Sequence, residues 1–266
     1  MQIDIVHETT YHFDRPLVGA LQELRVSPDD WACQRVDGWE LEFDGGVLEV
    51  SFRDHHSNQV QLVSLEPGVL SATVRSRGCV ETTDTHGVVT DERGFAPRWL
   101  YGRSTELTTA GPLVAGLLER FEPEDAEPLP RMHALSDHVR DTIEYDPGWT
   151  NVASTAEHAL EAGHGVCQDH AHVFVTAARA LGVPARYVSG YLLMDEQAGQ
   201  EAAHAWAEVF VDGLGWVGFD VANRVCPDDR YVRLAVGLDY REAAPVSGLR
   251  FGDSNEILEV ALQVQQ

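Results

Sequence analysis

The sequence contains no lysine. All 19 of its basic residues are arginine, and they stand against 43 aspartate and glutamate residues, which gives a formal net charge of −24 at pH 7. A protein of this charge would be repelled by nucleic acid and by anionic membrane surfaces, so neither is expected as a partner. The absence of lysine also excludes crosslinking of one copy to another through a lysine ε-amine.

Long apolar runs are missing as well. No run approaches the roughly 20 residues that a membrane-spanning helix needs, and the N-terminus lacks the basic flank and apolar segment of a secretory signal. These absences predict a cytoplasmic protein. The apolar content of 44% and the aromatic content of 8% are nevertheless typical of a globular protein. A chain of 266 residues can form one large domain or two smaller ones.

Cysteine is scarce, and its four residues form no CxxC pair: Cys33, Cys79, Cys167 and Cys226. A disulfide framework is not expected in a chain of this size without a signal peptide. Cys167 stands apart because two glycines precede it and an apolar pattern of helical spacing follows it as far as Gly182. A cysteine at the start of a helix lies beside unpaired backbone N–H groups at the positive end of the helix dipole. That environment favours the reactive thiolate, so Cys167 is the candidate nucleophile.

The hydrophobic patterns predict an α+β fold in two parts. Residues 1–95 contain short, partly alternating apolar runs separated by turn signals, which predicts a β-sandwich-like N-terminal domain. Residues 96–130 are predicted to be a linker with a short helix over residues 111–121, and the acidic, proline-bearing run Glu122–Pro130 is the expected boundary. Residues 131–266 are predicted to form a second domain, which includes the C-terminal strands.

Helices come first in this second domain, and strands follow them. Helical spacing indicates one helix over residues 132–143, a short one that ends at Gly163 and a third that begins at Cys167. Strands are expected over residues 185–194, 204–211, 216–220, 231–236 and 257–264. Strand alternation places His204, Trp206 and Glu208 on one face of their strand.

Cys167, His204 and Asp220 are the candidate catalytic triad. A nucleophilic cysteine needs a base that takes its proton and a third group that orients the base. His204 begins one predicted strand and Asp220 ends the next, so a hairpin would place the start of one strand beside the end of the other. A helix packed across this sheet edge would then bring Cys167 to the imidazole. The backbone N–H of Cys167, with one further donor, would receive the oxyanion.

Three motifs around these residues resemble the core of the transglutaminase-like superfamily. They are Gly165-Val166-Cys167-Gln168-Asp169, Ala203-His204-Ala205-Trp206-Ala207-Glu208 and Gly215-Trp216-Val217-Gly218-Phe219-Asp220. The order Cys, His, Asp is the catalytic order of that family, and the likeness covers residues 130–240. The segments His7-Glu8-Thr9-Thr10-Tyr11 and Asp54–Val60 also resemble the β-rich domain that precedes this core in many bacterial members.

The resemblance implies a papain-like transglutaminase core, in which the helix that bears Cys167 packs on an antiparallel sheet. It also implies acyl transfer on the amide bond of a peptide or protein through a thioester intermediate, without a metal or organic cofactor. If water accepts the acyl group, the protein is a cysteine protease or amidase, and hydrolysis is the expected reaction. If an amine accepts it, the protein is a transglutaminase. A catalytically inactive binding or assembly module is the third alternative.

Further side chains are expected to support or line the site. Asp169 and Asn223 are candidates for hydrogen bonds that support the triad. Trp149 is a candidate for a pocket wall, an indole N–H donor or plain packing, and Trp206 for flanking the site or for plain packing. His170 stands where family members often carry an aromatic residue, so it could alter the pocket.

A metal site is the chemical alternative. The pattern His164-x-x-Cys167-x-x-His170, with His172 nearby, has the residue types that zinc prefers, but it lacks a second cysteine pair or a His-Glu-x-x-His motif. His55 and His56 lie in a predicted turn and are expected to be solvated rather than to bind a metal. The sequence therefore favours thiol chemistry over a metal centre.

Overall fold

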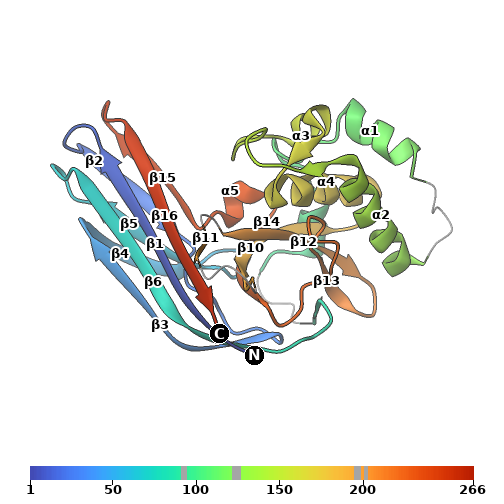
Figure 1. The fold of residues 1–266 in the computed structure, drawn as a ribbon, viewed down its shortest axis with the longest axis horizontal. Helices are drawn as coiled ribbons and strands as arrows, with labels where there is room; N and C mark the ends of the chain where they lie inside the picture. Colours follow the sequence, from blue (N-terminus) through green and yellow to red (C-terminus); the bar gives the residue numbers. More distant parts are fainter. Residues whose placement is uncertain (91–94, 122–126, 195–198, 201–202) are drawn as a thin grey trace.

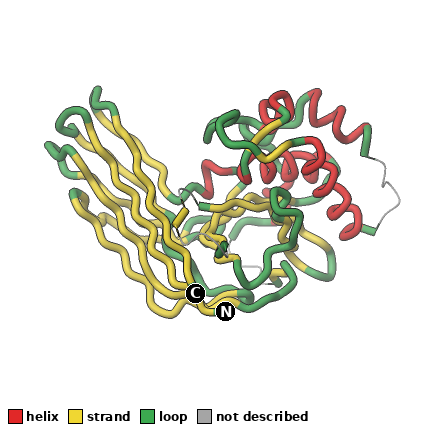
Figure 2. Tube along the Cα trace, in the orientation of Figure 1, coloured by secondary structure: helices red, strands yellow, loops and turns green. Residues whose placement is uncertain are grey.

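The computed structural model of the chain describes residues 1–266 except 91–94, 122–126, 195–198 and 201–202. Figure 1 shows two long antiparallel sheets on one side of the molecule and a helix-covered sheet on the other. The helices are confined to the second part, as Figure 2 shows by element type. The fold is therefore of the predicted α+β class, with mostly antiparallel sheets.

Two sheets form the β-sandwich. The first has the strand order β11-β16-β1-β6-β3, and the second has the order β15-β2-β5-β4. Their strands are β1 (Gln2–Phe13), β2 (Gly19–Leu24), β3 (Gln34–Asp44), β4 (Gly46–Arg53), β5 (Gln59–Leu65), β6 (Ser71–Thr82), β11 (Gly199–Gln200), β15 (Val246–Phe251) and β16 (Glu256–Gln265). The side chains of β1 alternate between covered and exposed, as a strand with one buried face requires. Tyr11 and Phe13 join the apolar cluster between the two sheets.

The last two strands of the chain return to this sandwich. β16 pairs antiparallel with β1 from Asp4 opposite Gln265 to Phe13 opposite Glu256, and β15 pairs antiparallel with β2. Both strands lie within residues 131–266, which were predicted to form the second domain, so the sheet pairing does not follow the predicted division. The pattern of a strand shows which of its faces is buried, but it does not show which strand lies beside it.

A third sheet and the α-helices of the described residues form the second part, which we call the core. The sheet has the strand order β14-β10-β12-β13-β7. Its strands are β7 (Val88–Val89), β10 (Ala185–Leu192), β12 (His204–Val211), β13 (Gly215–Phe219) and β14 (Tyr231–Gly237), and a separate parallel pair is formed by β8 (Glu144–Tyr145) and β9 (His164–Gly165). The helices are η1 (Arg98–Gly102, a 3-10 helix), α1 (Pro112–Glu119), α2 (Pro128–Thr142), α3 (Ala156–Ala162), α4 (Cys167–Ala180) and α5 (Tyr240–Ala243).

Part of the predicted linker packs inside the core. Val114 and Leu117 of α1 are buried in the same apolar cluster as α2 and α4. Proline stands in the first turn of α1 and of α2, where the missing N–H costs no intrahelical bond. Residues 122–126 of the expected boundary run lie outside the described residues.

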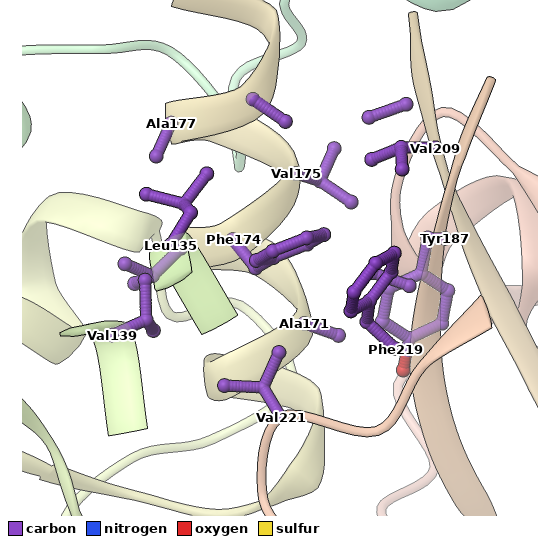
Figure 3. Close-up of a cluster of buried hydrophobic side chains, with 14 of the residues drawn as sticks. Leu135, Val139, Ala171, Phe174, Val175, Ala177, Tyr187, Val209, Phe219 and Val221 are labelled. Carbon is purple, nitrogen blue, oxygen red and sulfur yellow. The ribbon is translucent and has the colours of Figure 1, made fainter. Parts of the chain in front are cut away.

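Helix α4 is held between α2 and the sheet. Figure 3 shows Phe174 and Val175 directed toward the sheet residues Val209 and Phe219, with Leu135 of α2 on the other side. The rings of Phe174 and Phe219 have their centroids 5.2 Å apart. Burying a phenylalanine side chain stabilises a fold by roughly 1.5–3 kcal/mol, so this packing fixes the start of α4 relative to the strands. None of the described helices is both long and apolar enough to span a membrane.

The face of this sheet that turns away from α4 holds a buried ionic cluster. Glu208 accepts a hydrogen bond from Arg186 Nε at 2.7 Å and forms an ion pair with Arg233. The three side chains are at most 4% exposed. The guanidinium of Arg186 also lies 4.0 Å above the Trp216 ring, a favourable cation–π geometry.

Candidate active site

The chain reaches Cys167 through a tight turn. Helix α3 ends at Gly163, whose φ of 67° lies in the left-handed region that favours glycine. Gly165 follows in β9, where an added Cβ would meet the Asp169 side chain at 2.7 Å. The two glycines therefore let the chain pass close to Asp169 and place Cys167 at the first position of α4.

Asp169 holds the start of α4 in place. Its Oδ2 accepts hydrogen bonds from the Val166 backbone N–H at 2.8 Å and from the Thr150 hydroxyl at 2.7 Å. The residue is 1% exposed, and burial raises the pKa of its carboxyl although the hydrogen bonds act in the opposite direction. Asp169 thus has the supporting position expected from the sequence, and it acts on the turn that carries Cys167.

The hairpin of β12 and β13 brings His204 to Asp220. The register sets Ala207 opposite Phe219, so the start of β12 lies beside the residue that follows β13. His204 Nε2 donates to Asp220 Oδ2 at 2.6 Å, and a hydrogen bond also joins the imidazole to the Cys167 thiol. Burial lowers the pKa of His204, but its bonds with Asp220 and Cys167 outweigh burial and raise the pKa to about 10. The imidazolium is therefore the favoured form at neutral pH, and a cation at this position stabilises a neighbouring thiolate.

Asp220 is fully buried and receives several hydrogen bonds. Its Oδ2 accepts from the Asn223 side-chain amide at 2.7 Å and from the Tyr231 hydroxyl at 2.7 Å, besides His204. Burial raises the pKa of this carboxyl, but the bonds from His204, Tyr231 and Asn223 outweigh burial and lower it. Asp220 therefore stays ionised, and it can orient the imidazole through Nε2 while the other ring nitrogen faces Cys167.

Two tyrosines at the site were not predicted. Tyr231, at the start of β14, packs its ring edge-on against Trp206 in addition to its bond with Asp220. Tyr145 of β8 lines the site, and burial first, then the charges of Cys167 and Asp220, raise the pKa of its phenol. A lone tyrosine carries no spacing signal, so the sequence could not single out either residue.

The other side chains predicted at the site differ in whether they contact the triad. Asn223 bonds to Asp220 as expected. Trp206 is buried beside His204, with ring centroids 6.4 Å apart, which is a packing role. Trp149 is 55% exposed and stacks on His164, so it is neither a pocket wall nor a buried packing residue. Its indole N–H donates to Asp146 Oδ2 at 2.9 Å and not to a residue of the triad. His170 is fully buried away from the pocket, with its ring nitrogens bonded to the carbonyls of Val166 and Ile143.

The histidines around Cys167 do not converge on one point. His172 Nε2 accepts from the Tyr240 backbone N–H, whereas His164 lies beside Glu144 and Trp149. The described residues contain one group with metal-ligand spacing, formed by His55, His56 and Glu242.

Both ring nitrogens of His56 in this group already take part in hydrogen bonds. Nε2 of His56 bonds to Glu242 at 2.9 Å, and its Nδ1 bonds to the Tyr101 hydroxyl at 2.8 Å. His56 is also buried, so the expectation of a solvated turn is wrong for this residue. Its polar partners compensate for the loss of water.

A cleft of about 1160 Å³ opens onto Cys167 and His204. One wall comes from the core, including the start of α4 and the residues around Tyr145. The other wall comes from β1 and β16 of the sandwich, which lie beside the core in Figure 1. The site is therefore built from both parts of the molecule.

Comparisons with known proteins extend over the whole chain. Residues 116–221 match the transglutaminase-like superfamily, and residues 3–81 match the bacterial transglutaminase-like N-terminal region. An uncharacterized protein of Mycobacterium tuberculosis is 33% identical over 287 residues, which cover 98% of this chain and 91% of that protein. A protein-glutamine gamma-glutamyltransferase of Pseudomonas aeruginosa is 30% identical over 154 residues, which cover 52% of this chain and 20% of that protein.

A solved structure shares the fold. The crystal structure of a "Putative Cysteine Protease" from Cytophaga hutchinsonii superposes with a TM-score of 0.77 and 21% sequence identity, covering 100% of this chain and 98% of that one. The sandwich and the core are thus found together in a second protein. On the evidence of both matched regions and of the relative that covers nearly its full length, the chain belongs to the transglutaminase-like superfamily.

Proposed function

We propose that the protein is a thiol-dependent hydrolase that cleaves an amide bond of a peptide or protein through a thioester on Cys167. The arrangement of Cys167, His204 and Asp220 carries this proposal. A nucleophile at a helix start, a histidine bonded to it and a buried carboxylate bonded to the histidine are the three roles that such chemistry requires.

The geometry assigns one task to each group. The Cys167 sulfur attacks the amide carbonyl carbon, and the backbone N–H of Cys167, at the first position of α4, is the proposed donor to the developing oxyanion. The His204 imidazolium gives a proton to the leaving nitrogen, the C–N bond breaks and an amine departs. Water, deprotonated by His204, then attacks the thioester and releases a carboxylic acid with the free thiol.

Water is the proposed acceptor because the cleft leaves room for it. Cys167 is partly exposed at a cleft of about 1160 Å³, so solvent can reach the thioester. The alternative acceptor is an amine, and the likeness of about half of this chain to a protein-glutamine gamma-glutamyltransferase favours it as the second candidate. An enzyme that transfers to amines must keep water from the thioester.

One assay separates the two reactions. A library of glutamine-containing and other peptides is incubated with the protein, with and without a primary amine, and the products are analysed by mass. We expect cleaved or deamidated peptides that form at the same rate in both mixtures. Amine adducts that exceed the hydrolysis products would establish transfer instead, and Cys167→Ala supplies the background for both reactions.

A further inference from the structure

Outside the triad, few charged side chains are found among the described residues that line the cleft at Cys167. Charged residues make up 23% of the chain, yet the described residues that line the cleft include neither arginine nor glutamate, and Asp169 is their one acidic member. The Asp169 carboxylate is buried and bonded to Val166 and Thr150. His204 is the cation among these residues, and it is already bonded to Asp220 and Cys167. The described lining residues outside the triad therefore offer a bound molecule no free counter-ion.

The sandwich wall of the cleft is formed by residues that lie opposite each other on β1 and β16. Thr9 lies opposite Val260 and Tyr11 lies opposite Leu258 in the ladder of β1 and β16, and all four residues line the cleft. Residues two apart on a strand share a face, so Leu258 and Val260 present apolar side chains side by side. Leu258 is 52% exposed, which leaves a large apolar side chain open toward the cleft.

The core wall carries apolar side chains beside uncharged polar ones such as Ser189 and Asn151. Its apolar members include Leu192, the last residue of β10, and Met194 two residues further on, which is 40% exposed. Pro245 and Val246, where β15 begins, also line the cleft. A cleft of about 1160 Å³ is larger than the roughly 300–1,000 Å³ of small-molecule pockets, so its volume suits several residues of a peptide.

We propose that the substrate is a peptide segment whose side chains beside the reacting amide are uncharged and apolar, and that Leu258 and Val260 of the sandwich select them. The inference rests on the proposed function and adds its substrate class. A charged side chain in this cleft would lose water without gaining a partner among the described lining residues outside the triad, whereas an apolar side chain gains by covering Leu258 and Met194. The sandwich is thus a specificity element and not only a neighbouring domain.

Peptidyl chloromethyl ketones that alkylate the Cys167 thiol test this inference. The panel carries leucine, glutamate or arginine beside the reactive carbonyl, and the measured quantity is the second-order rate of inactivation. We expect the leucine reagent to react at least 10-fold faster than the glutamate reagent. Equal rates across the panel would overturn the inference.

Substitutions of Leu258 in the sandwich wall test directly whether this residue selects the side chain of the reagent. Leu258→Asp is expected to slow the leucine reagent and to accelerate the arginine reagent, and Leu258→Arg is expected to favour the glutamate reagent instead. A misfolded variant would react more slowly with every reagent. A change in which reagent reacts fastest therefore reports the contact between residue 258 and the side chain of the reagent. Ile257→Asp is the matched control, because Ile257 is 68% exposed and points to the opposite face of β16.

The same experiment distinguishes the inference from the proposed function. Iodoacetamide is small and needs no subsite, so its reaction with Cys167 reports the nucleophile alone. One outcome is that the iodoacetamide rate depends on His204 while Leu258→Asp and Ile257→Asp show the same preferences among the chloromethyl ketones. That outcome would refute the proposed substrate class and leave the proposed hydrolase function unaffected. A rate indifferent to His204 would sink the proposed function itself.

Discussion

The Tyr231 hydroxyl donates a 2.7 Å hydrogen bond to Asp220 Oδ2, the same oxygen that accepts from His204 Nε2 at 2.6 Å. Tyr231 is therefore a positioning residue, since it acts on the imidazole only through the carboxylate. We predict that Tyr231→Phe lowers kcat by roughly 10-fold or more, because a hydrogen bond to a charged group is worth about 1.5–3 kcal/mol.

The pH profile tests that role. Loss of a donor raises the pKa of Asp220, so the acidic limb of kcat/KM moves to higher pH in Tyr231→Phe. Tyr191→Phe is the matched control, because Tyr191 is another buried tyrosine whose hydroxyl bonds to His7 and not to the triad. An unchanged profile in Tyr231→Phe, or an equal shift in the control, would refute the positioning role.

Asp169→Ala is predicted to weaken both the fold and the nucleophile. Loss of a helix-capping side chain costs about 0.5–2 kcal/mol, and here the cap also fixes the turn before Cys167. We expect slower alkylation of Cys167 together with a lower free energy of unfolding. Thr155 caps α3, because its hydroxyl accepts a hydrogen bond from the His158 N–H at 3.1 Å. Thr155→Ala should therefore lower the free energy of unfolding without changing the alkylation rate of Cys167.

Glu208→Gln is predicted to destabilise the protein by about 3–5 kcal/mol, because it leaves the charges of Arg186 and Arg233 buried without their carboxylate. Denaturant unfolding measures the change. Glu81→Gln removes an exposed partner of Arg35 and should leave stability almost unaltered. Equal effects of the two substitutions would contradict the burial of the cluster.

Acid is predicted to destabilise the fold through His7. Burial lowers the pKa of this residue to about 4, from an ordinary value of 6.5. Its contribution is therefore fully present above pH 6.5 and is lost as pH falls toward 4, by about 3 kcal/mol. His7→Gln should flatten the pH dependence of the unfolding free energy in this window. Burial lowers the pKa of His172 to about 3, so this residue acts in the same direction. Part of the pH dependence of the unfolding free energy should therefore remain in His7→Gln.

The sequence was enough to predict which of these side chains the fold brings together, because their spacing reports local structure. A glycine turn before a helical pattern located Cys167, and two strands in succession predicted a hairpin that joins His204 to Asp220. The order of these motifs supplied the family, which the comparisons confirm.

Long-range pairing was not predictable in this way. Nothing in the alternation of residues 257–264 shows that β16 pairs with β1 at the far end of the chain, and the sandwich wall of the cleft depends on that pairing. The contact of Tyr231 with Asp220 escaped prediction for the same reason, because it depends on the packing of β14 against the hairpin. The stacking of Trp149 on His164 is likewise a contact that the sequence pattern does not show.

His204 is proposed to activate Cys167, and the rate at which Cys167 is alkylated as a function of pH measures this activation. Iodoacetamide is titrated against the wild type and His204→Ala, with Cys167→Ala giving the background from the other three cysteines. We predict a fast rate that stays level across neutral pH in the wild type, and in His204→Ala a slow rate that rises only at alkaline pH. Identical profiles in the two proteins would contradict the account and favour a binding module over an enzyme.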